Sequence, residues 1–121
     1  MKWLKSLYVG EKIAQDKEAV MRLIRHPEWK SRFAFCCLIS PAPQSGENLE
    51  VLPLFMLCQK HFNRQDRIIL GIAAGTGEAD GLLLRMTQDC LDAGGGVRVK
   101  DYFLNLPDDA YEDGGEAEPE K

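Results

Sequence analysis

The sequence predicts a small α/β domain with the order α-β-α-β-α, in which a two- to three-stranded parallel sheet is flanked by helices. Two short apolar runs, within residues 32–40 and 66–73, are typical of strands buried on both faces. A helix is expected between them, and a strand–helix–strand crossover makes its two strands parallel and the crossover right-handed. The chain has 121 residues, 45% of them hydrophobic and 28% charged, which fits one domain with one core.

The first predicted helix spans residues 11–25. Asp16 would cap its start if the helix begins late, and Pro27 ends it. The preceding segment, 3–9, fits either a strand or the lead-in to this helix, and both interpretations stay open. The prediction of a helix depends on apolar residues at helical spacing and on basic residues near the C-terminus: Ile13, Val20, Leu23 and Ile24, then Arg22, Arg25 and His26.

The buried strand over 32–40 stops at Pro41 and is followed by a loop over 44–48. Residues 49–52 fit an extended segment. A second helix is predicted over 53–62, because proline is well tolerated in the first turn of a helix and apolar residues follow it.

The second buried strand, 66–73, leads through Gly75-Thr-Gly77 into the clearest helix of the sequence. Apolar residues keep the 3.6-residue period as far as Ala93. Three glycines, 94–96, end this helix in the manner of a left-handed cap. Residues 97–103 fit a short strand or a closing turn.

Charge divides the chain near residue 107. Residues 107–121 hold seven acidic residues and one lysine, a net charge of −6, whereas residues 1–106 carry +2. The acidic segment has almost no apolar side chains, so it cannot bury enough surface to offset its ordering entropy. We therefore expect one α/β domain over 1–106 and a disordered acidic tail over 107–121. This tail is solvated, lies over a basic face of its own domain, or binds a basic partner.

Several classes of protein are not supported by the sequence. No apolar run approaches the length of a membrane span, and the first residues lack the apolar core of a secretory signal, so we expect a cytoplasmic protein with no membrane partner. Basic residues near the N-terminus form no stripe or recognisable module for nucleic acid. The histidines, His26 and His61, lack ligand spacing to the cysteines, so no metal or other cofactor is predicted. The cysteines lie in apolar segments without C-x-x-C spacing and are expected to be buried and reduced: Cys36, Cys37, Cys58 and Cys90.

The most suggestive motif is the spacing Gly71-x-x-x-Gly75-x-Gly77 between a strand and a helix. It resembles the dinucleotide-binding loop of short-chain dehydrogenases, where glycine lets the backbone approach a phosphate at a helix N-terminus. However, Glu78 and Asp80 in the first helical turn would repel a phosphate, and too little chain follows to complete a dinucleotide fold. A tight structural turn is the preferred interpretation.

The alternative is a ligand bound at the carboxyl ends of the strands, and four residues would line that crevice: Ser40, Gly75, Thr76 and Gly77. The spacing Cys58-x5-Arg64 matches the phosphatase signature, but Cys58 is expected on the apolar side of a helix, where no anion cradle forms. No constellation of nucleophile and base stands out, so no catalytic residue is assigned.

Three segments together resemble a family of small bacterial α/β proteins of unassigned function: Ile69–Ala79, Leu7–Glu11 and Asp101–Phe103. The resemblance extends over residues 7–103. It implies a cytoplasmic bacterial protein of about this length, and it implies no catalytic or binding residue.

A sheet of two or three strands has edges that need a cover, either the terminal segments or a second copy of the chain. We therefore interpret the protein as a non-enzymatic protein-association module that forms a homodimer. The alternative is a regulatory domain that binds a small molecule or an anion at the C-terminal ends of the strands.

Overall fold

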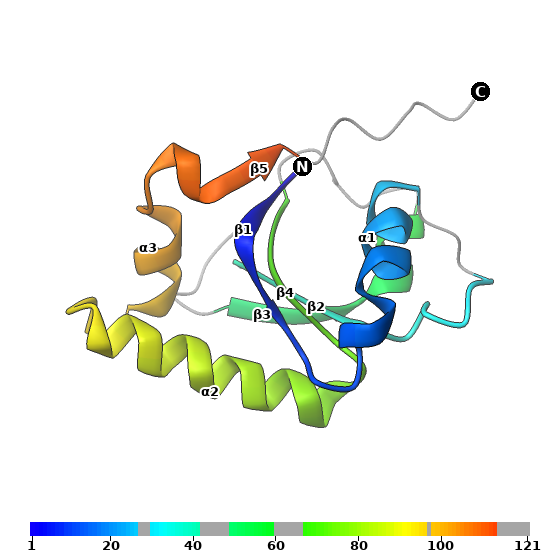
Figure 1. Ribbon diagram of the computed structural model, residues 1–121, viewed down its shortest axis with the longest axis horizontal. Coiled ribbons are helices and arrows are strands. Elements are labelled where there is room, and N and C mark those ends of the chain that lie inside the picture. The colour runs from blue at the N-terminus through cyan, green and yellow to red at the C-terminus, as the bar shows by residue number, and fades with distance from the viewer. Residues whose placement is uncertain (27–29, 42–48, 60–66, 97, 114–121) are drawn as a thin grey trace.

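The computed structural model describes residues 1–26, 30–41, 49–59, 67–96 and 98–113. Its centre is a five-stranded mixed sheet with the strand order β3-β2-β4-β1-β5 (Figure 1). The five strands are β1 (Lys2–Val9), β2 (Cys37–Pro41), β3 (Leu49–Pro53), β4 (Ile68–Ala73) and β5 (Tyr111–Asp113).

The expected parallel sheet of two or three strands is wrong. β2 and β4 are neighbours, but they run antiparallel instead of parallel, and only β1 and β4 form a parallel pair. The reason lies in residues 49–53, which form β3 as the antiparallel partner of β2. Because of this additional reversal of the chain, β4 runs antiparallel to β2. A single helical crossover between the two strands would have made them parallel. The α-β-α-β-α order is wrong for the same reason.

The helices agree with the sequence in part. The long helix α2 (Thr76–Asp92) lies where it was predicted, and Gly94, with φ of +83°, follows it as a left-handed residue. The first helix is shorter than predicted, because Ala14–Asp16 forms a 3₁₀ turn, η1, before α1 (Lys17–Arg25). Asp16 is the residue before α1, but its side chain makes no capping hydrogen bond.

Two other predictions of local structure are wrong. The predicted helix 53–62 is replaced by β3 and a 3₁₀ helix, η2 (Leu54–Cys58), within its described part. A short strand or a closing turn was expected over residues 97–103, but residues 99–103 belong to the short helix α3 (Val99–Leu104). The segment from residue 107, expected as a tail, contains the 3₁₀ turn η3 (Asp108–Ala110) and β5, and residues 114–121 lie outside the described residues.

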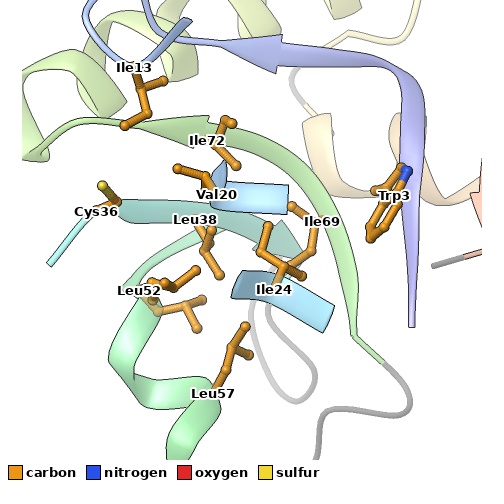
Figure 2. Packing of buried hydrophobic residues seen from close by; sticks show 11 residues of the cluster. Trp3, Ile13, Val20, Ile24, Cys36, Leu38, Leu52, Leu57, Ile69 and Ile72 are labelled. Atoms are coloured by element: carbon orange, nitrogen blue, oxygen red, sulfur yellow. The ribbon is translucent and has the colours of Figure 1, made fainter. Parts of the chain in front are cut away.

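The sheet separates two apolar layers. On one face, α1 and η2 cover Leu38 of β2 and Ile69 and Ile72 of β4, as Figure 2 shows for the side chains of this layer. On the other face, α2 and α3 cover a second cluster that includes Leu70 and Ala73 of β4. β4 therefore contributes to both layers and is the central strand of the fold (Figure 1). Within the described parts of the chain, no helix is both long and apolar enough to cross a membrane.

The second layer supplies a test of the core. Met86 of α2 has no exposed surface, whereas Leu84, two residues earlier, is 73% exposed. We predict that Met86→Ala lowers the free energy of unfolding by about 2–5 kcal/mol, because it leaves a cavity in the core. Leu84→Ala, the matched control, changes it by less than about 0.5 kcal/mol. Urea unfolding followed by circular dichroism measures both values, and equal effects of the two substitutions would contradict the packing of α2 described here.

Candidate functional site

The glycine-rich turn between β4 and α2 does not need glycine for its backbone shape. Gly75, the residue before α2, has φ of −167° and ψ of −175°, an extended conformation open to any residue. A Cβ atom added at Gly75 or Gly77 would meet no atom within 4 Å. Neither glycine is therefore required by a left-handed dihedral or by close packing within the described residues.

The carboxylate of Glu78 occupies this turn. Its Oε1 accepts a hydrogen bond from the backbone N–H of Ala74 at 2.9 Å, and its Oε2 accepts one from the backbone N–H of Lys12 at 2.7 Å. A Cβ at Gly10 would lie 1.8 Å from Oε1, so the absence of a side chain at Gly10 makes room for the carboxylate. The negative charge at the start of α2 is favourable for the helix and unfavourable for a phosphate. The turn thus joins the segment after β1 to the start of α2.

The structure does not bring the four predicted ligand-binding residues together. Because β2 runs antiparallel to β4, Ser40 lies toward the start of β4, and Gly75 follows the end of that strand. Ser40 is 1% exposed, and its hydroxyl group donates a hydrogen bond to the carbonyl oxygen of Pro41 at 3.4 Å. Thr76 and Gly77 are exposed next to Gly75.

The cysteines are all free thiols, and three of the four are buried as predicted. Burial raises the pKa of Cys36 and of Cys37, so these thiols are protonated near neutral pH and are poor nucleophiles. Cys58 is half-buried, at the last position of η2, instead of in the middle of a helix. His61 and Arg64 lie outside the described residues. Among the residues that the structure does describe, no group of histidine, cysteine or acidic side chains could hold a metal ion.

A feature that the sequence did not indicate is the outer edge of β3. The N–H of Leu54 bonds to the carbonyl oxygen of Cys36 at 2.8 Å, and the antiparallel register pairs Leu52 with Leu38 and Glu50 with Ser40. Hydrogen-bonded pairs alternate in such a ladder, so these residues of β3 face β2. The N–H and C=O groups of Leu49 and Val51 therefore point away from the sheet, and no described strand lies beyond them.

Two aromatic side chains continue this edge beyond Pro53. The N–H of Phe55 bonds to the carbonyl oxygen of Ala34 at 2.9 Å, which holds η2 beside residues 34–36. The rings of Phe35 and Phe55 lie 5.6 Å apart, and Phe35 is 77% exposed, more than any other large apolar residue of the described segments. Phe55 itself is half-buried. An exposed aromatic side chain next to an open strand edge is typical of a surface that contacts another protein.

The opposite edge of the sheet carries a groove of about 360 Å³ between α1 and β1. Its apolar lining includes Trp3, Leu7 and Met21. The guanidinium carbon of Arg25 lies 4.9 Å from the centroid of the Trp3 ring. Four cationic and two anionic side chains complete the lining: Lys5, Lys17, Arg22 and Arg25, with Glu18 and Glu112.

No protein-family model, curated protein or solved structure matches this chain. The geometry of the two sheet edges is therefore what supports a function.

The role of Glu78 can be tested with a double-mutant cycle. We predict that Glu78→Ala lowers the free energy of unfolding by about 1–3 kcal/mol, because two backbone N–H groups lose a charged acceptor. Gly10→Ala is also destabilising, because its Cβ would overlap the carboxylate. In the Glu78→Ala background, Gly10→Ala should lower the free energy of unfolding by at least about 1 kcal/mol less than it does in the wild type.

The control is Asp80→Ala, which removes an exposed carboxylate two residues further along α2 and leaves both hydrogen bonds intact. Chemical denaturation of the wild type and of these four variants gives all the free energies. Additive effects of Gly10→Ala and Glu78→Ala would show that the carboxylate does not occupy the space beside Gly10.

Proposed function

We propose that this protein is an association module that forms a homodimer by pairing β3 with β3 of a second copy. The observation that carries the proposal is the outward row of backbone groups at Leu49 and Val51 on the edge strand β3. Unpaired backbone groups at a sheet edge bind a further strand readily. An edge can pair antiparallel with its own copy, which gives the two-fold symmetry of most homodimers.

The hydrogen-bonding groups of β3 suit a two-fold axis at Val51. In that register, each Val51 exchanges two hydrogen bonds with Val51 of the other copy. The N–H of Leu49 then faces the carbonyl oxygen of Pro53 in the other copy. Proline lacks an N–H group, so the pairing uses every outward donor that β3 has. The closed dimer would contain one continuous sheet with both β3 strands at its centre.

Electrostatics favours this register over its neighbour. An axis at Glu50 would place two glutamates directly opposite each other, and like charges in that position are destabilising. With the axis at Val51, Glu50 lies opposite Leu52 of the other copy. Glu50 also forms an ion pair with Arg67 within its own chain. The charge of Glu50 therefore limits which register the two edges adopt.

The side chains of this edge provide apolar area for the interface. Leu49 and Val51 are half-buried and pack against the layer under α2. Across the two-fold axis, the same pair from a second copy would extend that layer. The exposed Phe35 and its neighbour Phe55 lie at the end of the same edge, where they add aromatic surface to the contact.

The predicted alternative, a site for a small molecule or an anion, has less support from the geometry. Ser40 is separated from Gly75, Thr76 and Gly77, and Glu78 fills the turn with a carboxylate. We therefore place the association surface at β3.

The dimer is tested by light scattering on the purified chain over a range of concentrations. We expect a mass of two chains for the wild type. Val51→Lys should give a single chain, because the two-fold axis would bring two ammonium groups together.

The matched control is Leu84→Lys, which adds the same charge at an exposed apolar residue on α2 and should leave the dimer intact. Circular dichroism confirms that each variant is folded. A wild type that stays monomeric at every concentration, or a dimer that persists in folded Val51→Lys, would refute the β3 interface.

A further inference from the structure

We propose that the groove between α1 and β1 is a binding site for a small amphipathic carboxylate, a molecule with an apolar body and one anionic head. The groove has a volume of about 360 Å³, at the lower end of the size range of small-ligand pockets. It lies on the side of the sheet away from β3, so the site does not depend on the β3 dimer. The proposal rests on the position of the cationic side chains, on the apolar surface between them, and on a carboxylate that the groove already binds.

The groove has two walls, α1 and β1, which run in opposite directions (Figure 1). The C-terminal end of α1 lies near the start of β1, where the guanidinium carbon of Arg25 lies 4.9 Å from the centroid of the Trp3 ring. Lys17, Met21 and Arg25 are spaced four residues apart, so they lie on one side of the helix, and all three line the groove. Lys17 therefore lies at the end of the groove opposite Trp3.

The Trp3 end of the groove already holds a carboxylate. Glu112 of β5 pairs with Trp3 in the sheet, and its Oε2 accepts a hydrogen bond from the indole Nε1–H at 3.2 Å. The guanidinium group of Arg25 stacks on the same indole. One anionic and one cationic side chain thus meet at Trp3, and their charges balance. This end does not attract a further anion, but it shows that a donor beside a cation in this lining binds a carboxylate.

The rest of the groove has an excess of positive charge. Lys5, Lys17 and Arg22 line it, and Glu18 is the anionic side chain beside them. Within the residues that the structure describes, none of these three cations forms an ion pair. A bound carboxylate would accept charge-assisted hydrogen bonds from them, and the planar guanidinium of arginine matches its two oxygens. We therefore place the head of the ligand at Lys17 and Arg22.

Apolar side chains lie between this cationic part and Trp3. Leu7 and Met21 line the groove and are half-buried, so each leaves apolar surface facing it. An acyl or aryl body that covers Leu7 and Met21 removes this surface from water, which stabilises the complex in proportion to the area buried. A bare anion lacks such a body, and a neutral alcohol lacks the charged head. The groove therefore suits a molecule that has both.

The test uses the full chain with the substitution Trp29→Phe, which leaves Trp3 as its one tryptophan, and decanoate as the probe. Because Trp3 lines the groove, its fluorescence and its indole N–H signal in nitrogen-15 NMR spectra report binding there. We expect decanoate, kept below the concentration at which it forms micelles, to shift both signals saturably with one site per chain. Decanol, which lacks the charge, and acetate, which lacks the chain, should each bind at least about tenfold more weakly.

Variants in the same background locate the site. Lys17→Gln with Arg22→Gln should weaken the binding of decanoate at least about tenfold, because the head loses its charged donors. Met21→Gln, which keeps the size of the side chain, should weaken it at least about fivefold, because a polar group replaces an apolar contact. The matched control, Arg85→Gln with Arg98→Gln, removes two exposed cations from α2 and from the residue before α3 and should leave the affinity unchanged. Circular dichroism confirms that each variant is folded.

Each contrary result overturns the proposal. The absence of a saturable shift with decanoate shows that the groove is not a site for an amphipathic carboxylate. Acetate that binds as tightly as decanoate reveals a plain anion site, and decanol that does so reveals a plain apolar one. Binding that survives the Lys17 and Arg22 substitutions, or that weakens equally in the control variant, places the ligand elsewhere.

Discussion

The burial of β4 on both faces is the constraint on which the rest of the structure depends. Ile69 and Ile72 belong to the layer under α1, and Leu70 belongs to the layer under α2. Both edges of β4 are paired, with β1 on one side and β2 on the other. A Cβ at Gly71 would lie 3.0 Å from the backbone oxygen of Tyr8, so glycine at this position allows β1 to approach. Each helix covers one of the two faces that this strand creates.

Because the centre of the sheet is covered, the surfaces available for other molecules lie at its two edges. β3 exposes backbone groups and short apolar side chains, which suit another strand. The other edge is different in chemistry, because β5 covers only the start of β1 and the groove beside it is basic. The turn after β4, whose glycine spacing resembles a phosphate-binding loop, holds the carboxylate of Glu78. The two edges of the sheet therefore differ in the chemistry that they expose.

The sequence predicted the elements whose patterns are local. The apolar run of β4 and the helical period of α2 both carry enough signal by themselves, and Glu78 lies in the first turn of α2 as predicted. Whether β2 and β4 run parallel or antiparallel could not be predicted, because this depends on whether residues 49–53 form a strand. Proline at position 53 fits the end of a strand as well as the start of a helix. The three-residue strand β5 lies in an acidic segment without strand propensity and is defined by its pairing with β1. The basic groove likewise depends on α1 and β1 coming together in three dimensions.

The most direct test of the β3 interface is amide hydrogen exchange, measured by NMR at a high and a low protein concentration. The N–H groups of Glu50 and Leu52 face β2 and should be protected at both concentrations. Those of Leu49 and Val51 face outward, so they should be protected at high concentration and exchange rapidly after dilution. Exchange of Leu49 and Val51 at the same rate at both concentrations would contradict the proposal that β3 is the association surface.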